Sequence, residues 1–543
     1  RRFIPGLWGV DMPSIVLALL VQIIGLVLMM LLKGTISGSP VLFLLLGLFT
    51  FVGLADDRPN ILMISVDDLK PMLGTYGDPL VQSPTIDKLA EASALYEKAY
   101  CQQAVCGASR ASIMTGLRPD NSRVWEFRQH MRERNPQAIT IPEYFKSQGY
   151  MTCFAGKIFD YRCVADGKKQ DLKSWSRPEQ PRNSEAMKNL GFADPVFREK
   201  LRLKEIELKK NGQKASYDAI KKAIGGSPCY EDSIDGPDEI YEDGRIAREG
   251  VRLIKELGQK KKPFFIAVGF KKPHLPFNAP KKYWDLYKET DFTLEKYQKP
   301  VQGAPHYAYQ DSWEFSGYNV QRINGEVPES FQRKLKHGYA ACISYVDAQI
   351  AKLLKTLKDQ GLEKNTVIVF WSDHGFHLGD HGMWCKHSNY EQATRVPFFV
   401  YDPRQNLKKS RYTQPVELID MFPTLCQLSG LAIPEILDGK SLLSEAAENA
   451  KFALSQFPRN QGKNKKIMGY GFRFERYRYI EWVDNNYQQD NTQFGPLKAV
   501  ELYDYEKDPL EQVNLANNPE YKSILRRLQQ EAKESGLSRA IYE

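Results

Sequence analysis

Four nearly continuous apolar runs predict the core strands of the protein. They span residues 60–66, 263–270, 366–371 and 396–401. Each run is short, and polar residues do not alternate with apolar ones as they do in a strand with one solvent-exposed face. Such runs are typical of strands that are buried on both faces of a sheet.

Helical patterns lie between these runs. Apolar residues recur at helical spacing over 331–357 and predict a long helix. A serine followed by a proline favours a helix start at residue 83, and we expect this helix to extend to residue 96. Residues 161–245 are polar, Lys-rich and irregular, and indicate a long insertion. Strands that alternate with helices predict an α/β fold, a sandwich around a large, mainly parallel central sheet.

The pattern changes near the C-terminus. Residues 468–475 and 477–482 alternate as the two strands of a hairpin do, and residues 520–534 favour a helix. We therefore expect a main domain over 58–445 and a smaller C-terminal subdomain over 446–543, with an antiparallel sheet and a closing helix.

Residues 1–57 have the character of an apolar leader. Residues 15–32 are almost wholly apolar, and these 18 residues reach the lower limit for a membrane span. A second apolar run over 41–54 ends in small residues that suit a signal-peptidase site. A start at Met29 or Met30 gives an ordinary signal peptide; the alternative is a retained membrane anchor. Either reading predicts an exported protein, and only the anchor would place it at a membrane.

Composition narrows the class of protein. The roughly 490 residues after the leader suggest one large domain plus a smaller one. A net charge of +9 and an aromatic content of 12% fit a globular fold. Lys-rich patches such as 209–222 are typical of a solvated helix face, with attraction for polyanionic substrates as the alternative. No zinc-finger spacing or basic motif interleaved with aromatics indicates nucleic acid as a partner. The eight cysteines form no CxxC motif, and Cys153 and Cys163 are close enough in sequence to form a disulfide.

The first candidate for chemistry is the stretch from Cys106 to Arg110, Cys-Gly-Ala-Ser-Arg. It precedes a predicted helix, whose start offers unpaired N–H groups and partial positive charge. Such a place suits a nucleophile that meets an anion. The alternative is a buried thiol before an ordinary helix.

Two acidic clusters follow predicted strands. Asp67 and Asp68 end the first strand, and Asp373 and His374 end a later one. Ligands of open α/β sheets gather at the carboxyl ends of strands, and crowded carboxylates favour a hard cation as their counter-charge. Each cluster alone could be a strand-ending turn, but their occurrence together with Cys106 predicts one shared centre.

Three further polar residues complete the candidate site. Lys157, His274 and Lys386 each lie in a short motif after an apolar stretch. Together with Arg110, they could surround a tetrahedral anion while a metal ion holds its opposite side. Alone, each lysine is more often a surface group and the histidine a structural one.

These motifs together resemble the type I sulfatases, and most closely the iduronate-2-sulfatase branch. The similarity runs from about residue 58 to 515 and is weakest across 161–260. The stretches that carry it are Arg58–Leu69, Gly77–Asp87, Ala104–Asp120, Val268–His274, Ser372–Gly382 and Met468–Tyr470.

The resemblance implies an alkaline-phosphatase-like fold and a specific chemistry. A maturation enzyme would oxidise Cys106 to formylglycine, whose hydrated aldehyde attacks the sulfur of a sulfate ester. A single Ca²⁺ would be bound by Asp67, Asp68, Asp373, His374 and the modified Cys106. Arg110 would hold the diol.

The same resemblance gives roles to the cationic residues. Lys157, His274 and Lys386 would bind sulfate, and His274 would protonate the leaving oxygen. The implied substrate is a sulfated carbohydrate, for example the 2-O-sulfate of a uronic acid in heparan or dermatan sulfate.

Two positions depart from the family pattern. Ala108 stands where the motif usually has proline. Asp160 stands where the branch has a histidine that takes a proton in the elimination step. Asp160, His377 and His387 all remain candidates for that base; His377 and His381 could also be ordinary loop residues.

Two other classes of protein compete with this interpretation. One is a phosphatase or phosphodiesterase of the alkaline phosphatase superfamily, which usually uses Thr or Ser with two Zn²⁺ and therefore disagrees with Cys106. The other is a non-catalytic protein that binds sulfated glycans with Cys106 unmodified, which Asp160 favours.

Overall fold

In the computed structural model, the predicted leader over 1–57 lies outside the described residues. None of the helices that the structure describes combines the length and the apolar character that crossing a bilayer requires. The described residues are 58–164, 170–177, 191–310, 312–460, 466–485, 487 and 494–540.

The main sheet has the strand order β11-β2-β10-β7-β1-β5-β3, and β12 pairs with β2. The pairs β7-β1, β1-β5 and β5-β3 are parallel, whereas β10 is antiparallel to β2 and β7. The prediction of a mainly parallel sheet is confirmed, and the four predicted strands are β1, β5, β7 and β10. The strands are β1 (Asn60–Asp67), β2 (Ala94–Tyr100), β3 (Met151–Gly156), β5 (Phe264–Pro273), β7 (Thr366–Ser372), β10 (Arg395–Tyr401), β11 (Ser410–Tyr412) and β12 (Val416–Glu417).

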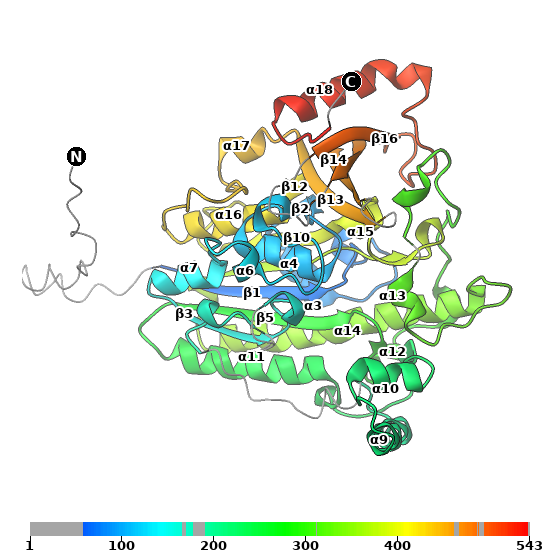
Figure 1. Cartoon of the computed structure of the whole chain (residues 1–543). Helices are drawn as coiled ribbons and strands as arrows, with labels where there is room; N and C mark the ends of the chain where they lie inside the picture. The colour runs from blue at the N-terminus through cyan, green and yellow to red at the C-terminus, as the bar shows by residue number, and fades with distance from the viewer. Residues whose placement is uncertain are drawn as a thin grey trace, which may run out of the picture. The chain divides into compact units, whose positions relative to one another are not determined.

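Two hydrophobic cores lie on opposite faces of this sheet. Leu62 and Ile64 of β1 belong to one core, with apolar residues of α11 (Glu242–Gly258) and α14 (Glu329–Asp359). The neighbouring Met63 belongs to the other core, which includes residues of α4 (Cys106–Thr115), α7 (Ile141–Ser147) and α16 (Met421–Leu428). Because side chains alternate along a strand, this division defines a helix–sheet–helix sandwich. Figure 1 shows α11 and α14 on one side of β1 and β5, and α4 and α7 on the other.

The helix predicted over 83–96 is wrong in its second half. Helix α3 spans Pro84–Glu91, and β2 begins at Ala94. The segment after the helix pairs with β10, so sheet formation ends the helix before the predicted residue 96.

The region 161–245 also contains more regular structure than its composition predicted. Among its described residues are α9 (Pro195–Lys210) and α10 (Tyr217–Ala223), each with an N-cap side chain that accepts a hydrogen bond from the first turn. The long helix predicted over 331–357 is confirmed as α14.

The disulfide considered between Cys153 and Cys163 does not form, since both cysteines are free. Cys153 belongs to the core with α14, whereas Cys163 belongs to the core with α4. The two thiols therefore lie on opposite faces of the sheet.

A second sheet follows near the C-terminus, with the antiparallel order β13-β14-β15-β16. The predicted hairpin is β14 and β15, and the predicted closing helix is α18. The boundary between the main domain and the C-terminal subdomain, placed between residues 445 and 446, stays a prediction. The elements are β13 (Phe452–Asn460), β14 (Lys466–Phe474), β15 (Tyr477–Asn485), β16 (Phe494–Asp504) and α18 (Lys522–Glu534).

Short elements complete the described fold. The helices are α5 (Pro119–Ser122), α6 (Met131–Arg134), α12 (Lys281–Trp284), α13 (Trp313–Ser316), α15 (Glu391–Thr394) and α17 (Glu445–Glu448). The strands are β4 (Tyr230–Glu231), β6 (Phe277–Asn278), β8 (His377–Leu378) and β9 (Trp384–Cys385).

Candidate active site

The two acidic clusters meet because they end neighbouring parallel strands. Val66 of β1 pairs with Ser372 of β7, so the next residue of each strand reaches the same edge of the sheet. The backbone N–H of Asp68 donates a hydrogen bond to Asp373 Oδ1 at 3.1 Å. Asp68 has a φ of 62°, a left-handed conformation that is uncommon outside glycine and here turns the chain away from β1.

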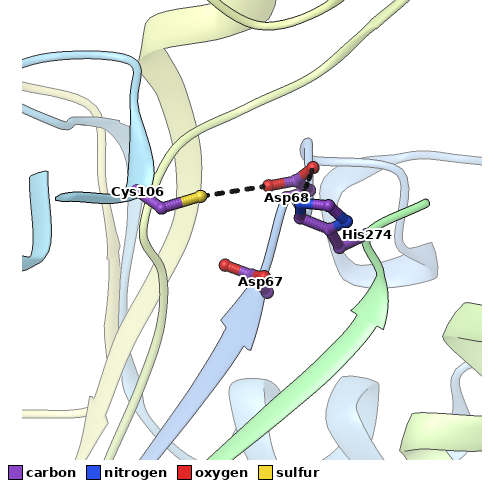
Figure 2. Close-up of side chains that lie close together, drawn as sticks. All are labelled: Asp67, Asp68, Cys106 and His274. Carbon is purple, nitrogen blue, oxygen red and sulfur yellow. Dashed lines mark hydrogen bonds and ion pairs between the residues drawn. The ribbon is translucent and has the colours of Figure 1, made fainter. Parts of the chain in front are cut away.

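Cys106 approaches this edge from the other side. It is the first residue of α4, as its motif predicted, and it is buried. Its Sγ lies 3.8 Å from Asp68 Oδ1 and 3.2 Å from His374 Nε2. Figure 2 shows the thiol pointing toward Asp68, with Asp67 at the tip of β1 beside it.

The metal-binding potential of this cluster can be judged from its donors. Ligand atoms of Asp68, Cys106, Asp373 and His374 all lie within 4.8 Å of one another, and so do those of Asp67, Asp68, Cys106 and His274. Carboxylate oxygens are the donors that hard divalent cations prefer, so the acids fit such an ion. His374 Nδ1 lies 2.9 Å from the carbonyl oxygen of Gly375, which fixes the ring so that Nε2 faces the cluster.

Arg110 ties the acidic strand ends together. It is fully buried, and its Nε donates to Asp373 Oδ2 at 2.9 Å while one Nη donates to Asp67 Oδ1 at 3.0 Å. Its other Nη donates to the carbonyl oxygens of Lys157 and Ile158 at 2.7 and 3.0 Å. One planar guanidinium thus fixes two carboxylates and the end of β3, which an ammonium group could not do.

Two lysines and a histidine lie close to the carboxylates of the cluster. Lys157 Nζ donates to Asp67 Oδ2 at 2.7 Å, and Lys386 Nζ donates to Asp68 Oδ2 at 2.8 Å. His274 Nε2 lies 3.8 Å from Asp68 Oδ2, while its Nδ1 lies 2.6 Å from the carbonyl oxygen of Leu275. The residues that the sequence singled out as metal ligands and as sulfate-binding groups therefore lie in one connected cluster.

The electrostatics of the site disfavour a thiolate. Burial, followed by the negative charge of Asp67, raises the pKa of Cys106 well above its ordinary value. A thiol in this state is a poor nucleophile. Burial also opposes ionisation of Asp67, but Lys157 and Arg110 outweigh it and hold the pKa of Asp67 well below its ordinary value. The carboxylate of Asp67 can thus stay charged where the sulfur cannot, whereas burial raises the pKa of the neighbouring Asp373 above its ordinary value.

Asp160 and His377, two of the three candidates for the base of the elimination step, form hydrogen bonds with residues outside the acidic cluster. Asp160 accepts hydrogen bonds from Arg162 Nε and Nη at 2.8 and 2.7 Å. Burial opposes its ionisation, but Arg162 and Lys157 hold the pKa of Asp160 below its ordinary value. His377 Nε2 lies 2.9 Å from Ser388 Oγ, and burial lowers the pKa of His377 to about 3. His381, the other possible loop residue, places Nε2 at 2.8 Å from the carbonyl oxygen of Leu510.

Sequence reasoning missed Glu314. Its Oε1 lies 2.9 Å from Lys386 Nζ and 3.3 Å from His274 Nε2, and its Oε2 lies 3.6 Å from His387 Nε2. It belongs to the four-residue helix α13, in a segment without any recognisable motif. Its role could not be predicted because only the folded chain brings it to the site.

Tyr339, which sequence reasoning also missed, supports the strand ends together with Ser372. Tyr339 of α14 donates through its hydroxyl to the carbonyl oxygen of Asp68 at 2.6 Å and accepts from the N–H of Lys70 at 2.8 Å. Ser372 Oγ accepts from the N–H of Leu69 at 2.9 Å. These bonds fix the turn that carries Asp68.

Comparison with known families identifies the family of the chain. The sulfatase family profile matches residues 59–431, most of the chain, so the chain belongs to the sulfatase family and is a sulfatase. A second profile, described as N-sulphoglucosamine sulphohydrolase, C-terminal, matches residues 379–536.

Curated relatives place the chain close to one branch of the family. It is 34% identical over 538 residues to iduronate 2-sulfatase of Homo sapiens, with 87% of this chain and 94% of that protein covered. The mouse (Mus musculus) iduronate 2-sulfatase is 33% identical over 539 residues with the same coverage. A sulfatase of Formosa agariphila is 30% identical over 490 residues, with 87% of this chain and 86% of that protein covered. The predicted resemblance to the iduronate-2-sulfatase branch is confirmed.

Solved structures confirm the fold. The phosphonate monoester hydrolase of Agrobacterium radiobacter aligns with a TM-score of 0.65 at 22% identity, covering 88% of this chain and 95% of the other. BT4656 in complex with its substrate D-glucosamine-2-N,6-O-disulfate aligns with a TM-score of 0.65 at 21% identity, covering 88% and 97%. At these identities the likeness concerns the alkaline-phosphatase-like fold alone.

Proposed function

We propose that this sulfatase hydrolyses sulfate esters of a sulfated carbohydrate, as an enzyme similar to iduronate 2-sulfatase, through a formylglycine at position 106 and one Ca²⁺. The observation that carries the proposal is the approach of Cys106 Sγ to Asp68 and His374 at the edge where both acidic strand ends meet. The relatives named iduronate 2-sulfatase support the choice of substrate class.

Two groups complete this site in the proposal. Formylglycine at position 106, made by a maturation enzyme, supplies an aldehyde whose hydrate offers the attacking hydroxyl. Ca²⁺ supplies positive charge that stabilises the sulfate oxygens, and Asp67, Asp68, Asp373 and His374 would hold it. The suppressed ionisation of Cys106 supports this assignment, because an unmodified thiol is poorly suited to attack.

The cationic side chains bind the sulfate. Lys157 and Lys386 provide ammonium donors from two different loops, and each is buried enough for its charge to act strongly on an anion. Asp67 and Asp68, which these ammonium groups contact here, would hold the divalent cation, and both ammonium groups would then be available to the sulfate oxygens.

His274 is suited to proton transfer. The carbonyl oxygen of Leu275 accepts from Nδ1, so Nε2 is the nitrogen that faces the site. A proton on Nε2 can pass to the alcohol oxygen as its bond to sulfur breaks. Arg110 keeps Asp67 and Asp373 in register and lies within the same network as Lys157, where it would hold the hydrated aldehyde. The base of the elimination step stays open between Asp160, His377 and His387.

The proposal also includes a compartment. The apolar pattern over 1–57 favours export, so the enzyme would meet its sulfated carbohydrate outside the cytoplasm.

A substrate screen tests the proposal. Purified protein, matured by a formylglycine-generating enzyme, is incubated with defined sulfated mono- and oligosaccharides, and free sulfate is measured. We expect release from at least one sugar, loss of release in Cys106→Ala and retention in Cys101→Ala, a buried thiol that contacts the carbonyl oxygen of Ala393 instead. Hydrolysis of phosphate esters without any sulfate ester would overturn the proposal in favour of a phosphoesterase. Binding of sulfated sugars without turnover would favour a glycan-binding protein.

A further inference from the structure

Glu314 places a carboxylate on the cationic side of the candidate site. Helix α13 carries it there, and its side chain is 16% exposed. Oε1 contacts both Lys386 Nζ and His274 Nε2, at 2.9 and 3.3 Å, and Oε2 faces His387 Nε2 at 3.6 Å. Glu314 therefore contacts two of the three residues proposed to bind sulfate, Lys386 and His274.

This carboxylate is ionised. Burial opposes the charge, but Lys386 and His274 outweigh burial and hold the pKa of Glu314 well below its ordinary value. Unlike Asp67, Asp68 and Asp373, it contacts neither Arg110 nor Cys106 among the described residues, so it lies apart from the acids that are proposed to bind the cation.

We propose that Glu314 is a specificity-determining residue that competes with sulfate for Lys386 and His274 and thereby weakens the binding of free sulfate more than that of a sulfate ester. This inference rests on the proposed function of the site. A carboxylate and a sulfate oxygen accept from the same donors, and two anions at one buried site repel each other.

The discrimination follows from charge. A sulfate ester carries one negative charge, whereas the inorganic sulfate released from it carries two. The repulsion from a fixed carboxylate scales with the charge of the ligand, so Glu314 disfavours the product about twice as strongly as the substrate. The residue would promote product release and keep the enzyme active when sulfate accumulates.

Calorimetric titration of the whole metal-loaded protein tests this inference without requiring turnover. The probes are inorganic sulfate and methanesulfonate, a non-hydrolysable monoanion, at constant ionic strength. Glu314→Gln keeps the size of the side chain and removes its charge. We expect it to bind sulfate at least about tenfold more tightly than the wild type, with a smaller gain for methanesulfonate. Glu326→Gln, which removes an exposed charge from the connection between α13 and α14, is the matched control and should bind both anions as the wild type does.

The inference would be overturned if Glu314→Gln bound sulfate no more tightly than the wild type does. It would also be overturned if the affinities for sulfate and methanesulfonate rose by the same factor, or if none of the three proteins bound sulfate. A purely structural role of Glu314 would lower the melting temperature of Glu314→Gln without tightening sulfate binding. A parallel assay of sulfate release keeps the two proposals separate. If the wild type hydrolyses no sulfate ester while Glu314→Gln still binds sulfate more tightly, the proposed function fails and the competition at Lys386 and His274 stands.

Discussion

Replacement of Arg110 by lysine is the sharpest test of how the site is held together. Arg110 donates four hydrogen bonds, two to the carboxylates of Asp373 and Asp67 and two to the backbone at the end of β3. Lysine preserves the positive charge but offers one compact ammonium group, which cannot reach all four acceptors.

The expected magnitude follows from the bonds lost. If the ammonium keeps two of the four, two hydrogen bonds to or from charged groups disappear, each worth about 1.5 kcal/mol. Arg110→Lys should therefore lower the free energy of unfolding by about 3 kcal/mol. Because Asp67 and Asp373 lose their common anchor, their oxygens shift, and misplacement of about 1 Å in an active site reduces turnover by about a hundredfold.

Arg118→Lys is the matched control. Arg118 pairs through Nε and an Nη with both carboxylate oxygens of Glu417, away from the candidate site. It should lose about 1.5 kcal/mol of unfolding free energy, because lysine keeps one of the two bonds, yet release sulfate at close to the wild-type rate per folded molecule. Equal activity losses in the two variants, or an unimpaired Arg110→Lys, would refute the view that Arg110 organises the catalytic carboxylates.

Other substitutions and conditions probe separate parts of the account. Asp373→Asn should weaken Ca²⁺ binding, measured by calorimetry, at least about a hundredfold. The control is Asp402→Asn, at a buried aspartate away from the site, which should bind Ca²⁺ as the wild type does. Equal affinities of the two variants would show that Asp373 is not a metal ligand. Gly156→Ala should lower both the melting temperature and sulfate release, because a Cβ would stand 2.1 Å from a carbonyl oxygen of β5 at a φ of +78°. Gly149→Ala, also at positive φ but with its nearest neighbour 3.6 Å away, should cost only about 1 kcal/mol and leave turnover intact. Burial raises the pKa of Asp243 to about 6, above its value in an unfolded chain, so its stabilising contribution is complete below about pH 4 and is lost as the pH rises through 6. Between pH 4 and 7 the wild type should lose about 3 kcal/mol of unfolding free energy relative to Asp243→Asn, and parallel urea curves for the two proteins would contradict this.

The sequence revealed the parts of the fold that depend on local pattern. β1 and β7 are continuous apolar runs, so their strands and the acids that follow them could be predicted together. The start of α4 at Cys106 was likewise readable from its motif.

What failed depends on long-range pairing. β2 begins at Ala94 because that segment pairs with β10, some three hundred residues further along the chain. The disulfide considered between Cys153 and Cys163 fails because a sheet separates the two side chains, which sequence distance cannot reveal. Glu314 was invisible for the same reason, since only tertiary structure brings it to Lys386.

The measurement that tests the central claim most directly is the mass of the peptide that contains residue 106, taken from protein made in a host with a formylglycine-generating enzyme. The account predicts a side chain that has lost sulfur and two hydrogens and gained one oxygen, and a rate of sulfate release that rises in proportion to the modified fraction. A peptide that retains the full Cys106 thiol in a preparation that still releases sulfate would contradict the account.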